Sequence, residues 1–200
     1  MNKDHYDPIP AWLSFTLNNP YRRRFDKGPE MVAGALRISD PSVVLDFGCG
    51  PGFYTVPFAR VAKQVIAVDL QDKMLEKAIK YAEKSGVKDK IRFLHTDGKR
   101  IPELQSGVCD FAFLGHVYHE IEHSARKDVL LDLWRVLKPG GRMAIMEHTK
   151  NAVMGPPAVN LEELKAGLEH ANFAEIEVID VSKDTGLIVA IKKSNNEGAP

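Results

Sequence analysis

The sequence predicts an α/β fold: an open, doubly wound and mostly parallel seven-stranded sheet with helices on both faces and a C-terminal antiparallel hairpin strand. Three features lead to this prediction. Short apolar runs rich in β-branched residues alternate with helical patterns along most of the chain. The first of these runs ends in a glycine-rich turn that precedes a helix. The last two runs are joined by only Asp184-Thr185-Gly186, which predicts a hairpin.

The apolar runs place the strands. We expect them at residues 43–47, 65–69, 91–95, 109–114, 143–147, 176–181 and 187–191. The clearest helix lies between the second and third runs. It is expected to begin at Asp72, an N-cap candidate, and to end at Gly86, with apolar residues at three- and four-residue spacing between them.

Two further helices follow the same reasoning. One is expected to begin at Ser124 or Asp128 and to end at residues 138–141, Lys-Pro-Gly-Gly, because proline and glycine stop a helix and turn the chain into the next strand. The other covers residues 161–168 and is capped by Asn160. Together these elements predict alternating strands and helices, with ligands at the carboxyl ends of the strands.

Length and composition suit one globular domain, since 200 residues with 44% hydrophobic content can bury a core unaided. We expect a single domain over residues 1–193. Residues 1–40 would be an N-terminal cap and helix segment, and residues 41–193 the cofactor-binding core. The polar tail, residues 194–200, is expected to be disordered.

The charge balance constrains the partner. Lys plus Arg and Asp plus Glu each number 27, so no overall field favours nucleic acid or an anionic membrane, and a small-molecule partner is expected. The two cysteines, Cys49 and Cys109, do not suggest a disulfide framework. The N-terminus has no basic-then-apolar leader, and no apolar run reaches the roughly 18 residues that span a bilayer. A cytoplasmic location is therefore expected.

The glycine turn has the spacing Gly48-x-Gly50-x-Gly52, which differs from the dinucleotide pattern G-x-G-x-x-G. Asp46 precedes it and either braces the turn through hydrogen bonds or contacts a ligand; the sequence leaves both open. Asp69 ends the second strand 21 residues after Gly48, the distance at which an acid reaches a ribose diol in nucleotide-binding α/β folds. An adenosine-bearing ligand is therefore predicted.

Five segments in the correct order resemble the motifs of class I S-adenosylmethionine-dependent methyltransferases. They are residues 44–52, 66–70, 96–98, 109–114 and 135–142. The resemblance covers roughly residues 28 to 192 and is closest to the small-molecule group that includes the quinone methyltransferases. It implies S-adenosylmethionine as the cofactor and methyl transfer as the activity.

The resemblance also implies a cofactor site. The glycine turn, with Gly48, Cys49, Gly50 and Gly52, would face the methionine part of the cofactor, and Asp69 the ribose hydroxyls. Leu70 and Gly98 would lie on the adenine faces, and Asp97 would meet the adenine amino group. Asp46 and Gly115, which flank the same strand ends, complete the predicted cofactor contacts.

Members of this group often carry a histidine after the fourth strand, near the methyl end of the cofactor, and His116 and His119 fall there. With Glu120 they are the candidate catalytic residues, for acceptor positioning or proton removal; a polar loop without chemistry is the alternative. His148 leaves the fifth strand, as Glu147 does, and is expected to reach the same crevice as an acceptor contact. His123 is expected to be solvated.

Two other patterns in the sequence have the residue types of a functional site. His119-Glu120-Ile121-Glu122-His123 has the form H-E-x-x-H, which on a helix would hold zinc, but here it follows a strand and precedes the expected helix. No metal is therefore expected. Near the N-terminus, Tyr21 and Arg22 are candidate acceptor contacts, as an aromatic lid and as a cation for a carboxylate or phosphate; an anchored aromatic and a solvated basic turn are the alternatives.

The predicted function is thus S-adenosylmethionine-dependent methylation of a small molecule at oxygen, carbon, nitrogen or sulfur. Methylation of nucleic-acid amines is disfavoured, because residues 114–118 read Leu-Gly-His-Val-Tyr instead of Asn/Asp-Pro-Pro-aromatic. The alternative is a protein that binds S-adenosylmethionine or S-adenosylhomocysteine without catalysis. A third alternative is a zinc hydrolase that uses His119, Glu120 and His123. The sequence leaves the oligomeric state open.

Overall fold

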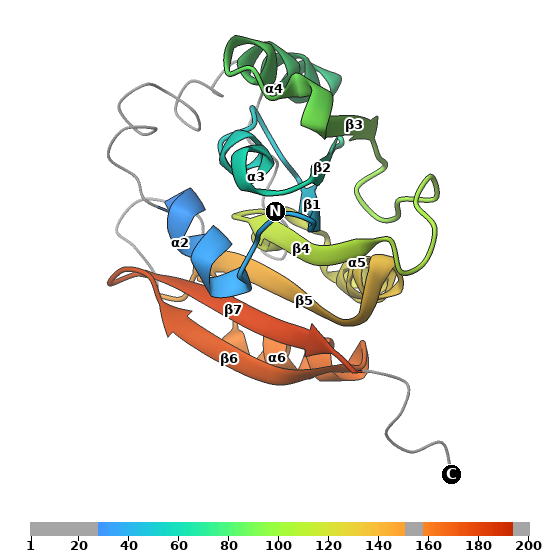
Figure 1. The fold of residues 1–200 in the computed structure, drawn as a ribbon. Helices are drawn as coiled ribbons and strands as arrows, with labels where there is room; N and C mark the ends of the chain where they lie inside the picture. Colours follow the sequence, from blue (N-terminus) through green and yellow to red (C-terminus); the bar gives the residue numbers. More distant parts are fainter. Residues whose placement is uncertain (1–27, 151–157, 194–200) are drawn as a thin grey trace.

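A computed structural model describes residues 28–150 and 158–193, and the structural statements below concern these residues. Their centre is one seven-stranded sheet with strand order β3-β2-β1-β4-β5-β7-β6 (Figure 1). The strands are β1 (Val43–Phe47), β2 (Gln64–Asp69), β3 (Ile91–His95), β4 (Cys109–Gly115), β5 (Leu137–His148), β6 (Phe173–Asp180) and β7 (Thr185–Lys192). The first five pair in parallel, and β7 runs antiparallel to both β5 and β6. The predicted fold class is confirmed.

Helices cover both faces of this sheet (Figure 1). The α-helices are α2 (Gly28–Leu36), α3 (Thr55–Val61), α4 (Asp72–Lys84), α5 (His123–Val136) and α6 (Leu161–His170), and two short 3₁₀ helices are η2 (Lys88–Lys90) and η3 (Tyr118–Glu120). None of the helices in residues 28–150 and 158–193 is both long and apolar enough to cross a membrane.

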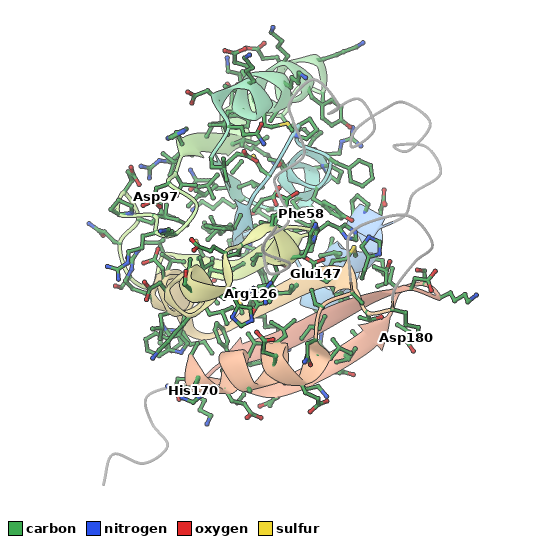
Figure 2. All side chains as sticks on the ribbon, turned by 180° about the vertical axis from the view of Figure 1, so that it is seen from behind. Phe58, Asp97, Arg126, Glu147, His170 and Asp180 are labelled. Atoms are coloured by element: carbon green, nitrogen blue, oxygen red, sulfur yellow. The ribbon has the colours of Figure 1, made fainter. Side chains whose placement is uncertain are left out.

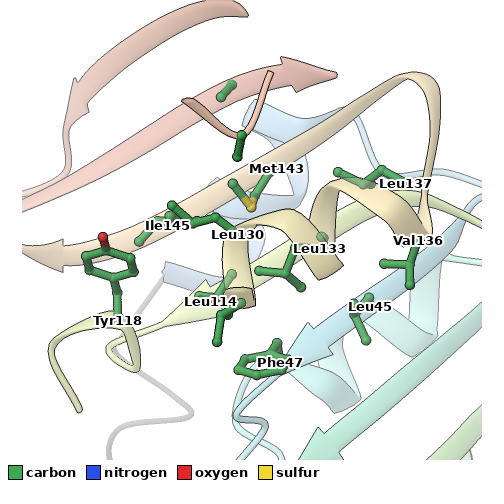
Figure 3. Close-up of a cluster of buried hydrophobic side chains, with 14 of the residues drawn as sticks. Leu45, Phe47, Leu114, Tyr118, Leu130, Leu133, Val136, Leu137, Met143 and Ile145 are labelled. Carbon is green, nitrogen blue, oxygen red and sulfur yellow. The ribbon is translucent and has the colours of Figure 1, made fainter. Parts of the chain in front are cut away.

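Alternating side chains divide the core into two halves. Leu45 and Phe47 of β1 pack with α5 and α6, whereas Val44 packs on the other face with α2, α3 and α4. Figure 3 shows the first half, where Leu130 and Leu133 of α5 lie over the sheet. Each fully buried side chain of this kind contributes roughly 1.5–3 kcal/mol. Packing on both faces leaves the strand ends as the place where ligands can reach the sheet.

The helix predicted after Asp69 has the expected extent, but its start differs. Asp72 is the first helical residue, Gln71 is the N-cap, and no side chain caps the helix. The carboxylate of Asp72 still lies in the first turn, where its negative charge interacts favourably with the helix dipole and stabilises the helix. Gly86 follows the end of the helix with φ +69°, a left-handed conformation that glycine adopts without strain.

The helix predicted from Ser124 or Asp128 begins earlier, at His123, and ends at Val136. The Lys-Pro-Gly-Gly segment is not a separate connection, because β5 already begins at Leu137. Leu137 pairs with Cys109, and the register then shifts before the regular ladder. Lys138 also reaches across to Asp110, with its Nζ 2.7 Å from the Oδ1 atom. Pairing with β4 therefore overrides the expected loop.

The C-terminal hairpin is present, but its turn lies earlier than predicted. β6 ends at Asp180 and β7 begins at Thr185, so residues 181–184 make the turn. Thr185 and Gly186 instead pair with the end of β5, which places them in the sheet. The predicted cap of α6 is confirmed, because Asn160 Oδ1 accepts hydrogen bonds from the backbone of Glu162 and Glu163. The predicted disordered tail, residues 194–200, lies outside the described residues.

Candidate cofactor and acceptor site

A cavity of about 550 Å³ opens at the carboxyl ends of β1, β2, β4 and β5. This volume lies in the range of small-molecule and cofactor sites. Its walls come from the glycine turn after β1, the ends of β2, β4 and β5, the loop after β3, and η3. The predicted site residues that line it are Gly48, Gly50, Asp69, Leu70, Asp97, Gly98, Gly115, His116, His119, Glu120 and His148. Residues spread over a hundred positions of sequence therefore share one cavity.

The glycine turn is held against β2. The backbone N–H groups of Gly48 and Cys49 both donate to the Val68 carbonyl oxygen at 2.9 Å. Gly48 has φ +73°, and a Cβ atom there would overlap the Val117 side chain. Both the left-handed backbone and the close approach of Val117 require glycine at this position. At Gly48 and Gly50 the turn thus presents bare backbone to the cavity.

Asp69 joins the turn to the cavity. Its Oδ2 atom accepts a hydrogen bond from Gly50 N at 2.8 Å, and its Oδ1 atom accepts one from Gln71 N at 2.8 Å. Burial raises the pKa of Asp69 above its ordinary value, and these two backbone hydrogen bonds offset part of that rise. Each carboxylate oxygen retains a further lone pair that can accept from a hydroxyl group.

The wall beside Asp69 is apolar. Leu70 is 46% exposed, which is unusual for a large hydrophobic residue in this fold, and it lines the cavity. Gly98 faces it from the loop after β3, where an added Cβ would lie 3.5 Å from Leu70 Cδ2. Leu70 and Gly98 thus lie side by side and form one apolar wall of the cavity, against which a flat aromatic ring such as adenine can lie.

The same loop carries Asp97, labelled in Figure 2. Asp97 is exposed, and its Oδ1 atom accepts hydrogen bonds from Lys99 N at 2.8 Å and from Arg100 N at 3.0 Å. These hydrogen bonds hold the pKa of Asp97 below its ordinary value. Asp97 therefore keeps a fixed negative charge beside this apolar wall of the cavity.

Cys49 and Gly52 were expected at the cofactor, and Asp46 either there or as a brace of the turn, but none of the three lines the cavity. Strand alternation turns Asp46 toward α3, where its Oδ2 atom accepts a hydrogen bond from Thr55 Oγ1 at 2.5 Å. Cys49 is buried, and a Cβ at Gly52 would lie 3.3 Å from Ala78 of α4. The observed contacts of these residues brace the turn and allow the helices to pack closely against it.

The buried carboxyl group of Asp46 should make the stability of the fold depend on pH. Burial raises the pKa of Asp46 to about 7, although the Thr55 hydrogen bond opposes this. A carboxyl group whose pKa is higher in the folded than in the unfolded state stabilises the fold at low pH, and this contribution is lost as the pH rises from about 4 to about 7. In Asp46→Asn, which keeps an oxygen acceptor for Thr55, that loss disappears.

We therefore expect Asp46→Asn to become more stable relative to the wild type as the pH rises, by up to about 4 kcal/mol between pH 4 and 8. Urea unfolding of both proteins across this range measures the difference. A difference that stays constant with pH would show that Asp46 does not titrate in this window.

The candidate catalytic histidines meet at the other end of the cavity. His116 follows β4 with φ +58°, and its backbone N–H donates to the Met146 carbonyl oxygen at 2.9 Å. The rings of His116 and His148 lie 5.0 Å apart with an interplanar angle of 40°. His148 Nδ1 is buried and makes no hydrogen bond within the described part of the chain. The ends of β4 and β5 thus share one crevice, as their sequence positions predicted.

His119 makes the strongest polar contact of this group. Its Nδ1 atom lies 2.9 Å from Glu147 Oε2, and its backbone N–H donates to Glu147 Oε1 at 3.2 Å. His119 is 7% exposed and Glu147 is fully buried. Burial alone would lower the pKa of His119, but the hydrogen bond and negative charge of Glu147 outweigh it and raise the pKa. The sequence predicted that Glu147 lies near the crevice but indicated no role for it. The feature that could have indicated a role is the presence of an acidic residue at the end of a buried strand.

The H-E-x-x-H pattern does not form a zinc site. Its first histidine lies in the 3₁₀ helix η3, and the second, His123, begins α5, so no single helix carries both on one face. The two imidazoles bind separate carboxylates, His119 that of Glu147 and His123 that of Glu163 at 2.7 Å. No cluster of three or more potential metal ligands occurs in residues 28–150 and 158–193. His123 is exposed, as expected. Tyr21 and Arg22 lie outside the described residues.

The sheet order, the glycine turn after β1 and the acid at the end of β2 define a Rossmann-like nucleotide-binding protein of the methyltransferase type. Comparison with known families matches residues 45–145 to the family described as a methyltransferase domain. The chain belongs to this family.

Solved structures and sequence relatives agree with this assignment. A SAM-dependent methyltransferase from Aquifex aeolicus superposes with a TM-score of 0.80 and 27% identity, covering 92% of this chain and 100% of that one. Among sequence relatives, an S-adenosyl-L-methionine-dependent Diels-Alderase from Talaromyces variabilis is 34% identical over 72% of this chain and 47% of its own length. A demethylmenaquinone methyltransferase from Lactobacillus johnsonii is 27% identical over 73% of this chain and 57% of its own.

A tRNA 5-carboxymethoxyuridine methyltransferase from Escherichia coli is also similar, at 29% identity over 62% of this chain and 48% of its own length. The chain thus spans about half the length of the curated relatives it matches. These relatives support the predicted resemblance to small-molecule and quinone methyltransferases. One of them, however, is a methyltransferase that acts on tRNA.

Proposed function

We propose that this protein binds S-adenosylmethionine in the cavity and transfers its methyl group to a small-molecule acceptor. The observation that carries the proposal is the single cavity that joins the glycine turn and Asp69 at one end to His116, His119 and His148 at the other. A cofactor held at the first end has its reactive part directed toward the second.

The walls of the cavity fit this cofactor part by part. The side-chain-free turn at Gly48 and Gly50 suits the amino-acid end, and the Asp69 carboxylate suits the ribose hydroxyls. The apolar wall formed by Leu70 and Gly98 suits adenine, with Asp97 beside it for the amino group. Gly115 lines the cavity at a position with no room for a side chain, because an added Cβ would lie 2.7 Å from the Phe113 ring. We propose that the elements described here belong to one methyltransferase domain with its core at residues 41–193.

S-adenosylmethionine supplies a methyl group that is already activated by the positive sulfur. The residues of the chain therefore have to align the acceptor and exclude water, and proximity and orientation alone can supply on the order of 7–11 kcal/mol of a barrier. His119 is the proposed base for an acceptor that must lose a proton. His116, His148 and Glu120 are the proposed acceptor contacts beside it, and Tyr21 and Arg22 are proposed to add contacts from the N-terminal segment.

We propose a small molecule instead of RNA as the acceptor, although one relative acts on tRNA. The whole chain carries equal numbers of acidic and basic residues, which gives no general attraction to a polyanion.

Both cysteines are free and buried, which supports the proposed cytoplasmic location. The Diels-Alderase relative favours one alternative: a protein that holds S-adenosylmethionine without donating its methyl group.

Calorimetric titration of the protein with S-adenosylmethionine and with NAD⁺ tests the proposal. We expect one site for S-adenosylmethionine, competition by S-adenosylhomocysteine, and no heat of binding with NAD⁺. Tight binding of NAD⁺ with none of S-adenosylmethionine would overturn the cofactor assignment. Transfer of tritium from methyl-labelled cofactor to a small-molecule extract is expected next; transfer to tRNA alone would contradict the acceptor class, and binding without any transfer would favour the alternative.

A further inference from the structure

Glu147 is a fully buried acid that directs both of its carboxylate oxygens to one residue. Strand alternation turns it toward the face covered by α5, where η3 brings His119 against it. Oε1 accepts from the backbone N–H of His119, and Oε2 meets Nδ1 of the same residue at 2.9 Å. The two contacts fix the position of the His119 backbone and the rotation of its ring together. Figure 2 labels Glu147 at the end of β5.

The contact also selects which ring nitrogen carries the proton. An ionised carboxylate only accepts hydrogen bonds, so a nitrogen facing it has to be the protonated one. With Nδ1 protonated, the neutral imidazole carries its lone pair on Nε2. His119 lines the cavity, and Nε2 is the nitrogen of this tautomer that can accept a proton.

We propose that Glu147 is a positioning residue that holds His119 in the Nδ1–H tautomer, so that Nε2 acts as the general base on an acceptor hydroxyl group. This inference rests on the proposed function and deepens it, because it names the class of acceptor. A thiol is readily ionised at neutral pH and needs no base, whereas a hydroxyl must lose its proton as it is methylated. A buried carboxylate–imidazole pair serves the second case.

The acceptor oxygen forms a bond to the methyl carbon while the carbon–sulfur bond breaks, the bonding pair stays on sulfur, and the hydroxyl proton moves to Nε2. His119 becomes an imidazolium whose charge faces the Glu147 carboxylate. The same carboxylate that orients the ring therefore stabilises its charged form.

Other charged groups act on His119 from the neighbouring elements. Glu120 on η3 favours the imidazolium, and Arg126 on α5 opposes it. His116 and His148 face the same end of the cavity. Among these, Glu147 alone makes a hydrogen bond to the ring in the described structure. Removing the charge of Glu147 should therefore lower the pKa of His119 more than any other single change.

Histidine NMR tests this inference without a known acceptor. In protein labelled with ¹⁵N-histidine, the wild type is expected to show His119 as the Nδ1–H tautomer at high pH, with a pKa above that of an ordinary histidine. Glu147→Gln keeps the shape and an oxygen acceptor but removes the charge, so the midpoint of His119 should fall by about one pH unit or more. The affinity for S-adenosylmethionine should stay within about twofold.

The chain provides a matched control in the pair His123 and Glu163, which lies on the surface. Glu163→Gln removes the carboxylate of a histidine–glutamate pair. Because Glu163 also pairs with Arg126 at 3.4 Å, this variant should shift the midpoint of His119 far less than Glu147→Gln does. A wild-type His119 in the Nε2–H form would overturn the inference even if Glu147→Gln fails to fold, and so would an equal midpoint in a folded Glu147→Gln. Failure of the proposed function would appear instead as absent cofactor binding in the wild type, so the two failures are distinguishable.

Discussion

Asp69→Ala is expected to weaken S-adenosylmethionine binding by about 100-fold or more. The substitution removes the acceptor for the N–H groups of Gly50 and Gln71, and with them the shape of the glycine turn. Each hydrogen bond to a charged group contributes roughly 1.5–3 kcal/mol, and the proposed ribose contact is lost as well. Calorimetric titration of the variant measures the change.

Asp72→Asn is the matched control for this experiment. Asp72 lies three residues further along, is 80% exposed in its side chain, and does not line the cavity. Its affinity for the cofactor should equal that of the wild type. Equal affinities of wild type and Asp69→Ala, with circular dichroism showing both folded, would remove Asp69 from the cofactor site.

Gly48→Ala is expected to have the second large effect, on stability as well as on binding. Alanine at this position takes the left-handed backbone and overlaps the Val117 side chain. The two terms together should lower the free energy of unfolding by about 2–4 kcal/mol. Urea unfolding measures this loss, and titration should show cofactor affinity reduced by at least about tenfold, because the turn has to shift.

Two variants separate the two causes. Gly107 has a similar φ of +68° but open space around it, so Gly107→Ala should lose only about 1 kcal/mol. In the double variant Gly48→Ala/Val117→Ala, the overlap with the valine methyl groups is removed, and part of the stability should return. If Gly48→Ala and Gly107→Ala destabilise equally, close packing against Val117 plays no part in the need for glycine at the turn.

The sequence predicted most of this fold because its strongest signals are local. The predicted ranges of β1 and β3 match the strands residue for residue. The run of β1 is readable because buried parallel strands consist of apolar residues bounded by turns. The errors occur where tertiary pairing overrides local chemistry. Pro139 and Gly140 look like a loop, but they lie within β5, because the residues on either side of them, at positions 137 and 142, pair with β4. Pairing with β5 likewise draws Gly186 into β7.

For the site, the positions of the residues could be predicted from the sequence, but their contacts could not. Asp69 and the histidines could be placed because parallel strands end at one edge of the sheet, and strand endings are readable from sequence. The partner of each side chain was not readable. The contact of Glu147 with His119 depends on the position of a three-residue 3₁₀ helix, and the contact of Asp46 with Thr55 depends on which face of β1 the aspartate takes.

A crystal structure with S-adenosylhomocysteine bound tests the central claim most directly. We expect the ribose hydroxyls within hydrogen-bonding distance of the Asp69 carboxylate, the adenine against the wall formed by Leu70 and Gly98, and the sulfur facing His119. S-adenosylhomocysteine in the opposite orientation, with its adenine against the histidines, or bound outside this cavity, would contradict it.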